Sequence, residues 1–76
     1  MRETVLDILR EIDPDTDFEH ETALIDHEIL DSFSVIRLVT ELMDRYDIEL
    51  DADDLEPENL NSVDAIVAMI LRKQEA

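Results

Sequence analysis

A serine that follows an aspartate at the start of an apolar segment is the residue best placed to do chemistry in this chain. Ser32 lies between Asp31 and Phe33 in the stretch ILDSFSVIRLV, residues 29–39. Its hydroxyl could simply cap the following helix, the commonest use of a serine in such a position. Asp31 is an equally good cap, because its carboxylate can accept the backbone amide of Phe33 or Ser34. Ser32 would then open the helix, with a free hydroxyl beside unpaired amides that favour a phosphate.

Three aspartates in the stretch DPDTDFEHETAL have part of the spacing of a calcium-binding EF-hand loop. Asp13, Asp15 and Asp17 match the first, third and fifth positions of such a loop. Phe18 stands where that loop needs glycine, and Leu24 stands where it needs a bidentate glutamate. The sequence therefore argues against an EF-hand and predicts only weak, nonspecific binding of divalent cations.

The residue types that most enzymes use are scarce. The chain contains no cysteine, and its two histidines, His20 and His27, lack the i, i+4 spacing of a helical metal pair. The many carboxylates are best interpreted as solvated faces. We therefore expect no catalytic residue, no metal site and no enzymatic activity.

Charge and length limit the partners and the size of the fold. Acidic residues number 22 against six basic ones, which gives a formal charge of -16 over 76 residues. Such a charge argues against nucleic acid or an anionic membrane as a partner and favours basic protein surfaces. The N-terminus lacks a secretory signal, and the longest apolar run, residues 65–71, is too short to insert into a membrane. We expect a single cytoplasmic domain, residues 1–76, that is a monomer.

Helical periodicity marks three main segments. The first covers roughly residues 3–12 and must end near Asp13, because Pro14 disfavours helical geometry in the residue before it. The connection of residues 13–30 has no sustained period, yet it contains apolar residues that we expect to pack against the bundle: Phe18, Leu24, Ile25, Ile29 and Leu30. Ser62 is expected to cap a last helix, and the stretch DADDL could form one short turn.

The helix after Ser32 has two apolar stripes. One is expected to face the core and comprises Val35, Leu38, Val39, Leu42 and Tyr46. The other has a charged rim, as expected of a docking strip for a protein partner, and comprises Phe33, Ile36, Arg37, Thr40, Met43 and Asp44. Ile36 and Met43 fit a wide core face equally well. The predicted fold is all-α, a small bundle of three main helices plus one short helix.

The chain resembles the acyl carrier protein family, which includes acyl, peptidyl and D-alanyl carrier proteins. The resemblance starts from Asp31, Ser32 and Phe33, which open an apolar helix, and it covers nearly the whole chain. It implies that Ser32 carries covalent 4′-phosphopantetheine, with Asp31 part of the motif that a phosphopantetheinyl transferase recognises. It also implies that the docking strip binds a cargo-loading ligase or acyltransferase and then downstream acyl-processing enzymes.

Three positions differ from the usual family pattern. Glu28 and its neighbours fill a turn where glycine is frequent, and Arg37 stands where many fatty-acid-type carriers have an acidic residue. Phe33 in place of leucine leans towards D-alanyl-type or other specialised carriers. The alternative function is an unmodified acidic module that binds one protein partner, in which Ser32 is only a helix cap.

Overall fold

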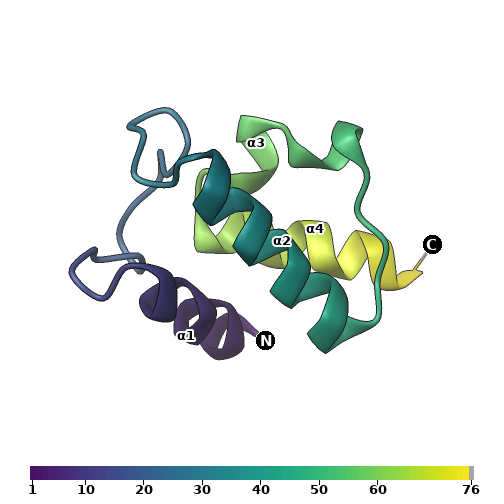
Figure 1. Cartoon of the computed structure of the whole chain (residues 1–76). Coiled ribbons are helices and arrows are strands. Elements are labelled where there is room, and N and C mark those ends of the chain that lie inside the picture. The colour runs from purple at the N-terminus through teal and green to yellow at the C-terminus, as the bar shows by residue number, and fades with distance from the viewer. Residues whose placement is uncertain (76) are drawn as a thin grey trace.

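The computed structural model describes residues 1–75, and they fold into three main helices, with two short ones between the second and the third main helix. The main helices are α1 (Arg2–Ile12), α2 (Ser32–Tyr46) and α4 (Val63–Glu75), and the short ones are the 3-10 helix η1 (Ala52–Leu55) and α3 (Pro57–Leu60). In Figure 1 a long connection leads from α1 to the start of α2, and α4 runs behind α2. The described residues contain no strand, so the predicted all-α fold is confirmed.

Neighbouring residues determine where α1 ends and where α4 begins. Helix α1 ends at Ile12 because Asp13 adopts an extended conformation, with φ of -145°, in front of Pro14. Helix α4 begins after Ser62, whose Oγ accepts the backbone N–H of Ala65 at 3.1 Å. The predicted end of the first helix and the predicted cap of the last are therefore confirmed.

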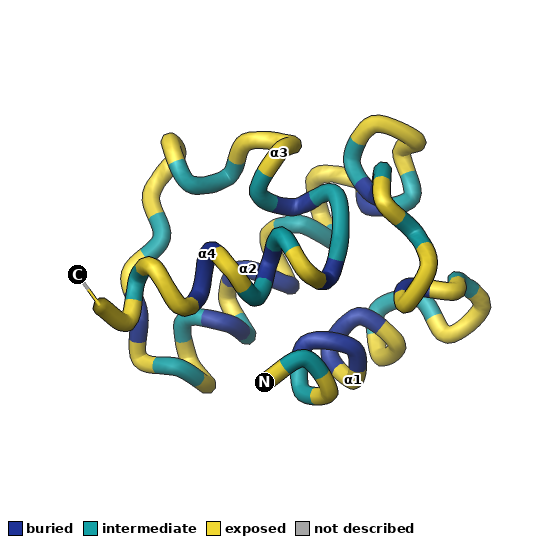
Figure 2. Tube along the Cα trace, turned by 180° about the vertical axis from the view of Figure 1, so that it is seen from behind, coloured by how far each residue is buried: buried dark blue, intermediate teal, exposed yellow. Residues whose placement is uncertain are grey.

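The core lies between the main helices and includes the connection between α1 and α2. Phe18, Leu24 and Leu30 from this connection are buried, while Ile25 and Ile29 are partly buried against the same core. In Figure 2 the buried stretches of the tube, in dark blue, lie toward the middle of the bundle, and some of them belong to this connection. The prediction of a packed connection is confirmed, and this packing fixes both ends of the segment that leads to Ser32.

The segment between α2 and α4 differs in part from expectation. The predicted short turn is η1, in which Asp51 and Asp54 form a reciprocal capping box. A second short helix, α3, follows directly and was not predicted. It begins at Pro57, whose fixed φ suits the first turn of a helix. Four residues are too few to show a helical period, so the pattern of apolar residues does not indicate this helix.

Candidate functional site

Helix α2 is capped by Asp31. The Asp31 Oδ1 atom accepts the backbone N–H of Ser34 at 2.8 Å, and its carbonyl oxygen accepts the N–H of Val35 at 2.9 Å. The bond from the Ser34 amide is the main reason that the pKa of the Asp31 carboxyl lies below its ordinary value. Asp31 therefore performs the capping role for which Ser32 was the competing candidate.

Ser32 is the first residue of α2 and is exposed to solvent. Within residues 1–75 the hydrogen bonds that cap α2 and hold the backbone around it do not use the Ser32 hydroxyl. As a first-turn residue it lies at the positive end of the helix dipole, where backbone N–H groups have no helical acceptor. The hydroxyl is thus accessible to another protein and lies where a phosphate would be stabilised.

The segment before the cap turns sharply without glycine. His27 N–H donates to the Ala23 carbonyl at 2.8 Å, and Glu28 N–H donates to the Ile25 carbonyl at 3.0 Å. Glu28 then adopts a left-handed conformation, with φ of 58°. A side chain with a Cβ atom is disfavoured there, so the turn is held by its surroundings and not by the preference of Glu28.

Asn61 holds this segment from the junction of α3 and α4. Its side-chain Oδ1 accepts the backbone N–H of Ile25 at 2.9 Å and that of Asp26 at 3.1 Å. Its Nδ2 donates to Asp26 Oδ2 at 3.2 Å, and its carbonyl accepts the Leu24 N–H at 2.9 Å. Sequence reasoning missed Asn61, because an asparagine beside a helix cap gives no sign of partners 35 residues away.

The predicted docking strip lies along the outer side of α2. Phe33 is 77% exposed and Ile36 is 65% exposed, although both are large and apolar. Thr40 is exposed and its Oγ1 donates to the Ile36 carbonyl at 2.8 Å, while Met43 is only partly buried. The core-facing alternative is therefore wrong for Ile36, and the strip begins directly beside Ser32.

Arg37 and Asp44 are the charged members of the strip, and both are exposed. Within residues 1–75 Arg37 forms no ion pair, since its neighbour Glu41 is taken by Arg45 (Nε to Oε2, 3.6 Å). A glutamate placed before an arginine at i, i+4 pairs better than the reverse order, which explains this choice. Arg37 is left available to an acidic group outside the chain.

The other candidate residues do not form a site. His20 pairs with Asp17 at 2.7 Å, which raises the pKa of the His20 imidazole, and His27 pairs with Glu21 at 3.3 Å. Both histidines are exposed, and no group of residues among positions 1–75 is arranged to hold a metal ion. No helix in this described part of the chain is long and apolar enough to cross a membrane.

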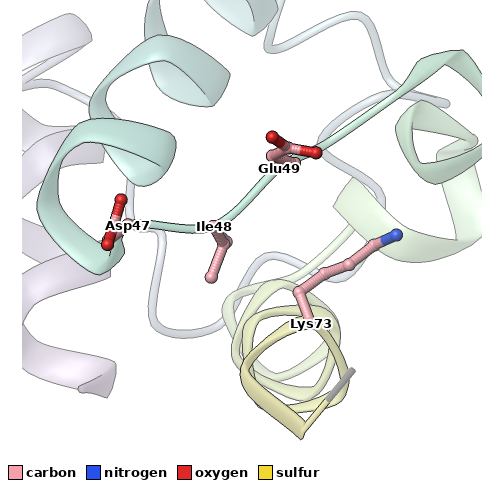
Figure 3. Close-up of a pocket in the computed structure, with 4 residues that line it drawn as sticks. All are labelled: Asp47, Ile48, Glu49 and Lys73. Carbon is pink, nitrogen blue, oxygen red and sulfur yellow. The ribbon is translucent and has the colours of Figure 1, made fainter.

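An open cavity of about 430 Å³ lies at the far end of α2 from Ser32. Figure 3 shows its lining, in which Asp47, Ile48 and Glu49 follow α2 and Lys73 projects from α4. At 1.5 Å per residue, Ser32 and Asp47 are roughly 22 Å apart along the helix. Three of the four lining residues are charged, so the cavity is poorly suited to an apolar chain.

A comparison with protein families identifies the family of the chain. Residues 1–70 match the family model described as phosphopantetheine attachment site. The chain belongs to this family. Members of the phosphopantetheine attachment site family bind 4′-phosphopantetheine covalently, so this protein is a carrier that works with a phosphopantetheinyl transferase and with acyl-processing enzymes. No curated protein and no solved structure matches the chain.

Proposed function

We propose that Ser32 is the attachment residue for 4′-phosphopantetheine and that this carrier presents an acyl or aminoacyl group to partner enzymes. The observation that carries the proposal is that Asp31, and not Ser32, caps α2. Asp31 caps the helix through its bond from the Ser34 amide, which leaves the Ser32 hydroxyl exposed and unpaired. The family match supplies the chemical identity of the group.

The residues around Ser32 suit a phosphodiester. The hydroxyl oxygen supplies the linkage, and the first-turn amides with the helix dipole stabilise the negative charge of the phosphate. When bound, the arm supplies the thiol that holds cargo as a thioester, which the cysteine-free chain cannot supply itself. Asp31 keeps the helix start fixed in place, and it is part of the proposed transferase recognition motif.

The docking strip of α2 is proposed to bind partner enzymes. Phe33 and Ile36 are exposed beside Ser32, so an enzyme that acts on the Ser32 hydroxyl must cover them. An interface of ordinary size buries about 800 Å² on each partner, enough to include Arg37, Thr40, Met43 and Asp44 as well. Apolar contacts at the centre with charges at the rim are the usual anatomy of such an interface.

The charges of the docking strip indicate which kind of partner surface is complementary to it. Basic groups of a partner would meet Asp44 and the strongly acidic surface around it, which speeds association. Arg37 has no acidic partner within residues 1–75, so a partner that also presents a carboxylate beside an apolar pocket fits best. The cargo-loading ligase or acyltransferase and the downstream acyl-processing enzymes are the proposed users of this surface.

Loading by a transferase tests the proposal. The full chain is incubated with coenzyme A and a broad-specificity phosphopantetheinyl transferase, and its intact mass is measured. Ser32→Ala is the test variant, and Ser34→Ala is the matched control two residues away. We expect one added phosphopantetheine on the wild type and on Ser34→Ala and none on Ser32→Ala. Failure of the wild type to load would favour the alternative, an unmodified interaction module.

A further inference from the structure

We propose that Asn61 is a positioning residue for the Ser32 hydroxyl, although it lies 29 residues later in the chain. The inference rests on the proposed attachment at Ser32 and adds a remote residue to that site. Asn61 lies at the junction of α3 (Pro57–Leu60) and α4 (Val63–Glu75), and it does not belong to α2 or to the docking strip.

Hydrogen bonds from Asn61 hold the segment that leads to Ser32 at three consecutive residues. The amides of Leu24, Ile25 and Asp26 all donate to Asn61 oxygens, at 2.9, 2.9 and 3.1 Å. The Asn61 amide returns a bond to the Asp26 carboxylate at 3.2 Å. An amide side chain is suited to this position because it accepts through oxygen and donates through nitrogen at the same time.

The remaining hydrogen bonds of this segment are local. Those of His27 and Glu28 end within the segment, at Ala23 and Ile25, and Glu21 accepts the amides of the two residues after it. Within residues 1–75, every hydrogen bond that joins residues 21–30 to a distant part of the chain ends at Asn61. Loss of the Asn61 side chain would therefore leave the segment with its apolar packing and one hydrogen bond to the α3–α4 junction, from the Leu24 amide to the Asn61 carbonyl.

The restraint reaches Ser32 through a short path. The Glu28 N–H donates to the Ile25 carbonyl at 3.0 Å, so the residue whose amide bonds to the Asn61 side chain also holds Glu28. The Leu30 N–H donates to the Leu24 carbonyl at 3.0 Å, which closes the turn just before the Asp31 cap. The turn between them includes Glu28 in its disfavoured left-handed conformation, which needs support from its surroundings. A looser segment would shift the cap and the Ser32 oxygen while leaving the rest of α2 packed on the core.

This placement predicts a specific kinetic effect. A displacement of about 1 Å at a reacting atom can cost up to 100-fold in rate, whereas binding at the strip depends on residues that do not move. For Asn61→Ala we expect kcat of the phosphopantetheinyl transferase to fall at least about fivefold, with KM for the carrier changed less than about twofold. Amide hydrogen exchange at Ile25 and Asp26 should rise in the same variant.

A matched control is available two residues away. Asn59 also forms two side-chain hydrogen bonds, from its Nδ2 to the Asp54 carbonyl and from Arg72 to its Oδ1, both at 3.0 Å. These bonds join α3 to η1 and α4 and do not reach the segment before Ser32. Asn59→Ala should therefore lower the melting temperature without changing kcat at temperatures where the variant is folded.

A reciprocal exchange separates positioning from general stability. Asn61→Asp keeps an acceptor for the two amides but places a carboxylate against Asp26, so kcat should fall. Adding Asp26→Asn places an amide donor opposite the new carboxylate at position 61 and returns the net charge to that of the wild type. In this double variant kcat should recover. The inference is overturned if wild-type protein loads and Asn61→Ala loads at the same kcat. It is also overturned if the exchange does not rescue Asn61→Asp, whereas failure of the wild type to load would instead contradict attachment at Ser32.

Discussion

The Asp31 carboxylate and the Ser34 amide, 2.8 Å apart, close the first turn of α2 around Ser32. Because the carboxylate accepts this bond in its charged form, the pKa of Asp31 is lower in the folded chain than in the unfolded one. The stabilisation is therefore present above the ordinary carboxyl pKa and is lost as the pH falls through the lowered pKa of the folded state.

Asp31→Ala should lower the melting temperature at neutral pH, because the Ser34 amide loses its acceptor. The difference from wild type should shrink when the pH falls through the lowered pKa of Asp31. Asp31→Asn is the control, since it keeps an oxygen acceptor and should show a smaller loss at neutral pH. Thermal unfolding followed by circular dichroism measures all three proteins, and a difference that stays constant through the acid range would contradict this role of the charge.

Glu28→Gly should stabilise the fold. The residue adopts φ of 58°, where a Cβ atom costs about 1–2 kcal/mol and glycine has no such penalty, although glycine loses more entropy on folding. We expect a net gain of about 1 kcal/mol in the free energy of unfolding by chemical denaturation.

Two further glycine variants serve as controls for Glu28. Asp47→Gly, at φ of 51°, should gain less because aspartate tolerates the left-handed region better than glutamate. Glu56→Gly, at φ of -74°, should gain nothing, because glutamate meets no steric penalty there. Equal gains at all three positions would show that backbone conformation is not the cause.

Phe33→Ala should weaken loading without weakening the fold. The side chain is 77% exposed, so the free energy of unfolding should change by less than about 0.5 kcal/mol. If the ring contacts the transferase, kcat/KM should fall by at least about tenfold. Leu71→Ala on α4 is the control, since Leu71 is also exposed, at 48%, but lies outside the docking strip. A loss of the same size in both variants would argue against the strip.

Salt should raise the melting temperature. A net charge of -16 on 76 residues opposes the compact state, and salt screens this repulsion over a Debye length that shortens to about 8 Å at 0.15 M. The melting temperature should rise between about 0.02 M and 0.5 M sodium chloride. Magnesium at equal ionic strength should raise it further, because divalent cations also bind weakly to the acidic surface. A flat or falling melting temperature would show that the repulsion is already compensated.

The sequence predicts those features that depend on neighbouring residues. The apolar period placed the main helices, the Asp31–Ser34 spacing favoured the cap, and the stripe from Phe33 to Asp44 proved to lie mainly on the outside of α2. These properties follow from helix geometry alone, because residues three and four apart share a face.

Features that depend on distant residues could not be predicted. The chain contains no glycine, so other residues must adopt positive φ where a turn requires it, but only the structure identifies Glu28 and Asp47. The bonds from Asn61 to Ile25 and Asp26 join residues 35 or more positions apart, and no local pattern encodes them. Helix α3, with its four residues, is likewise positioned by its contacts with α4.

The most direct test of the attachment site is fragment-ion mass spectrometry of the wild-type chain after loading. The measurement assigns the added mass to one residue within the peptide that contains Ser32, Ser34 and Asp31. We expect all of the added phosphopantetheine on Ser32. Modification of Ser34 or of any other residue would contradict the assignment of Ser32 as the attachment residue, and so would the absence of modification with an active transferase.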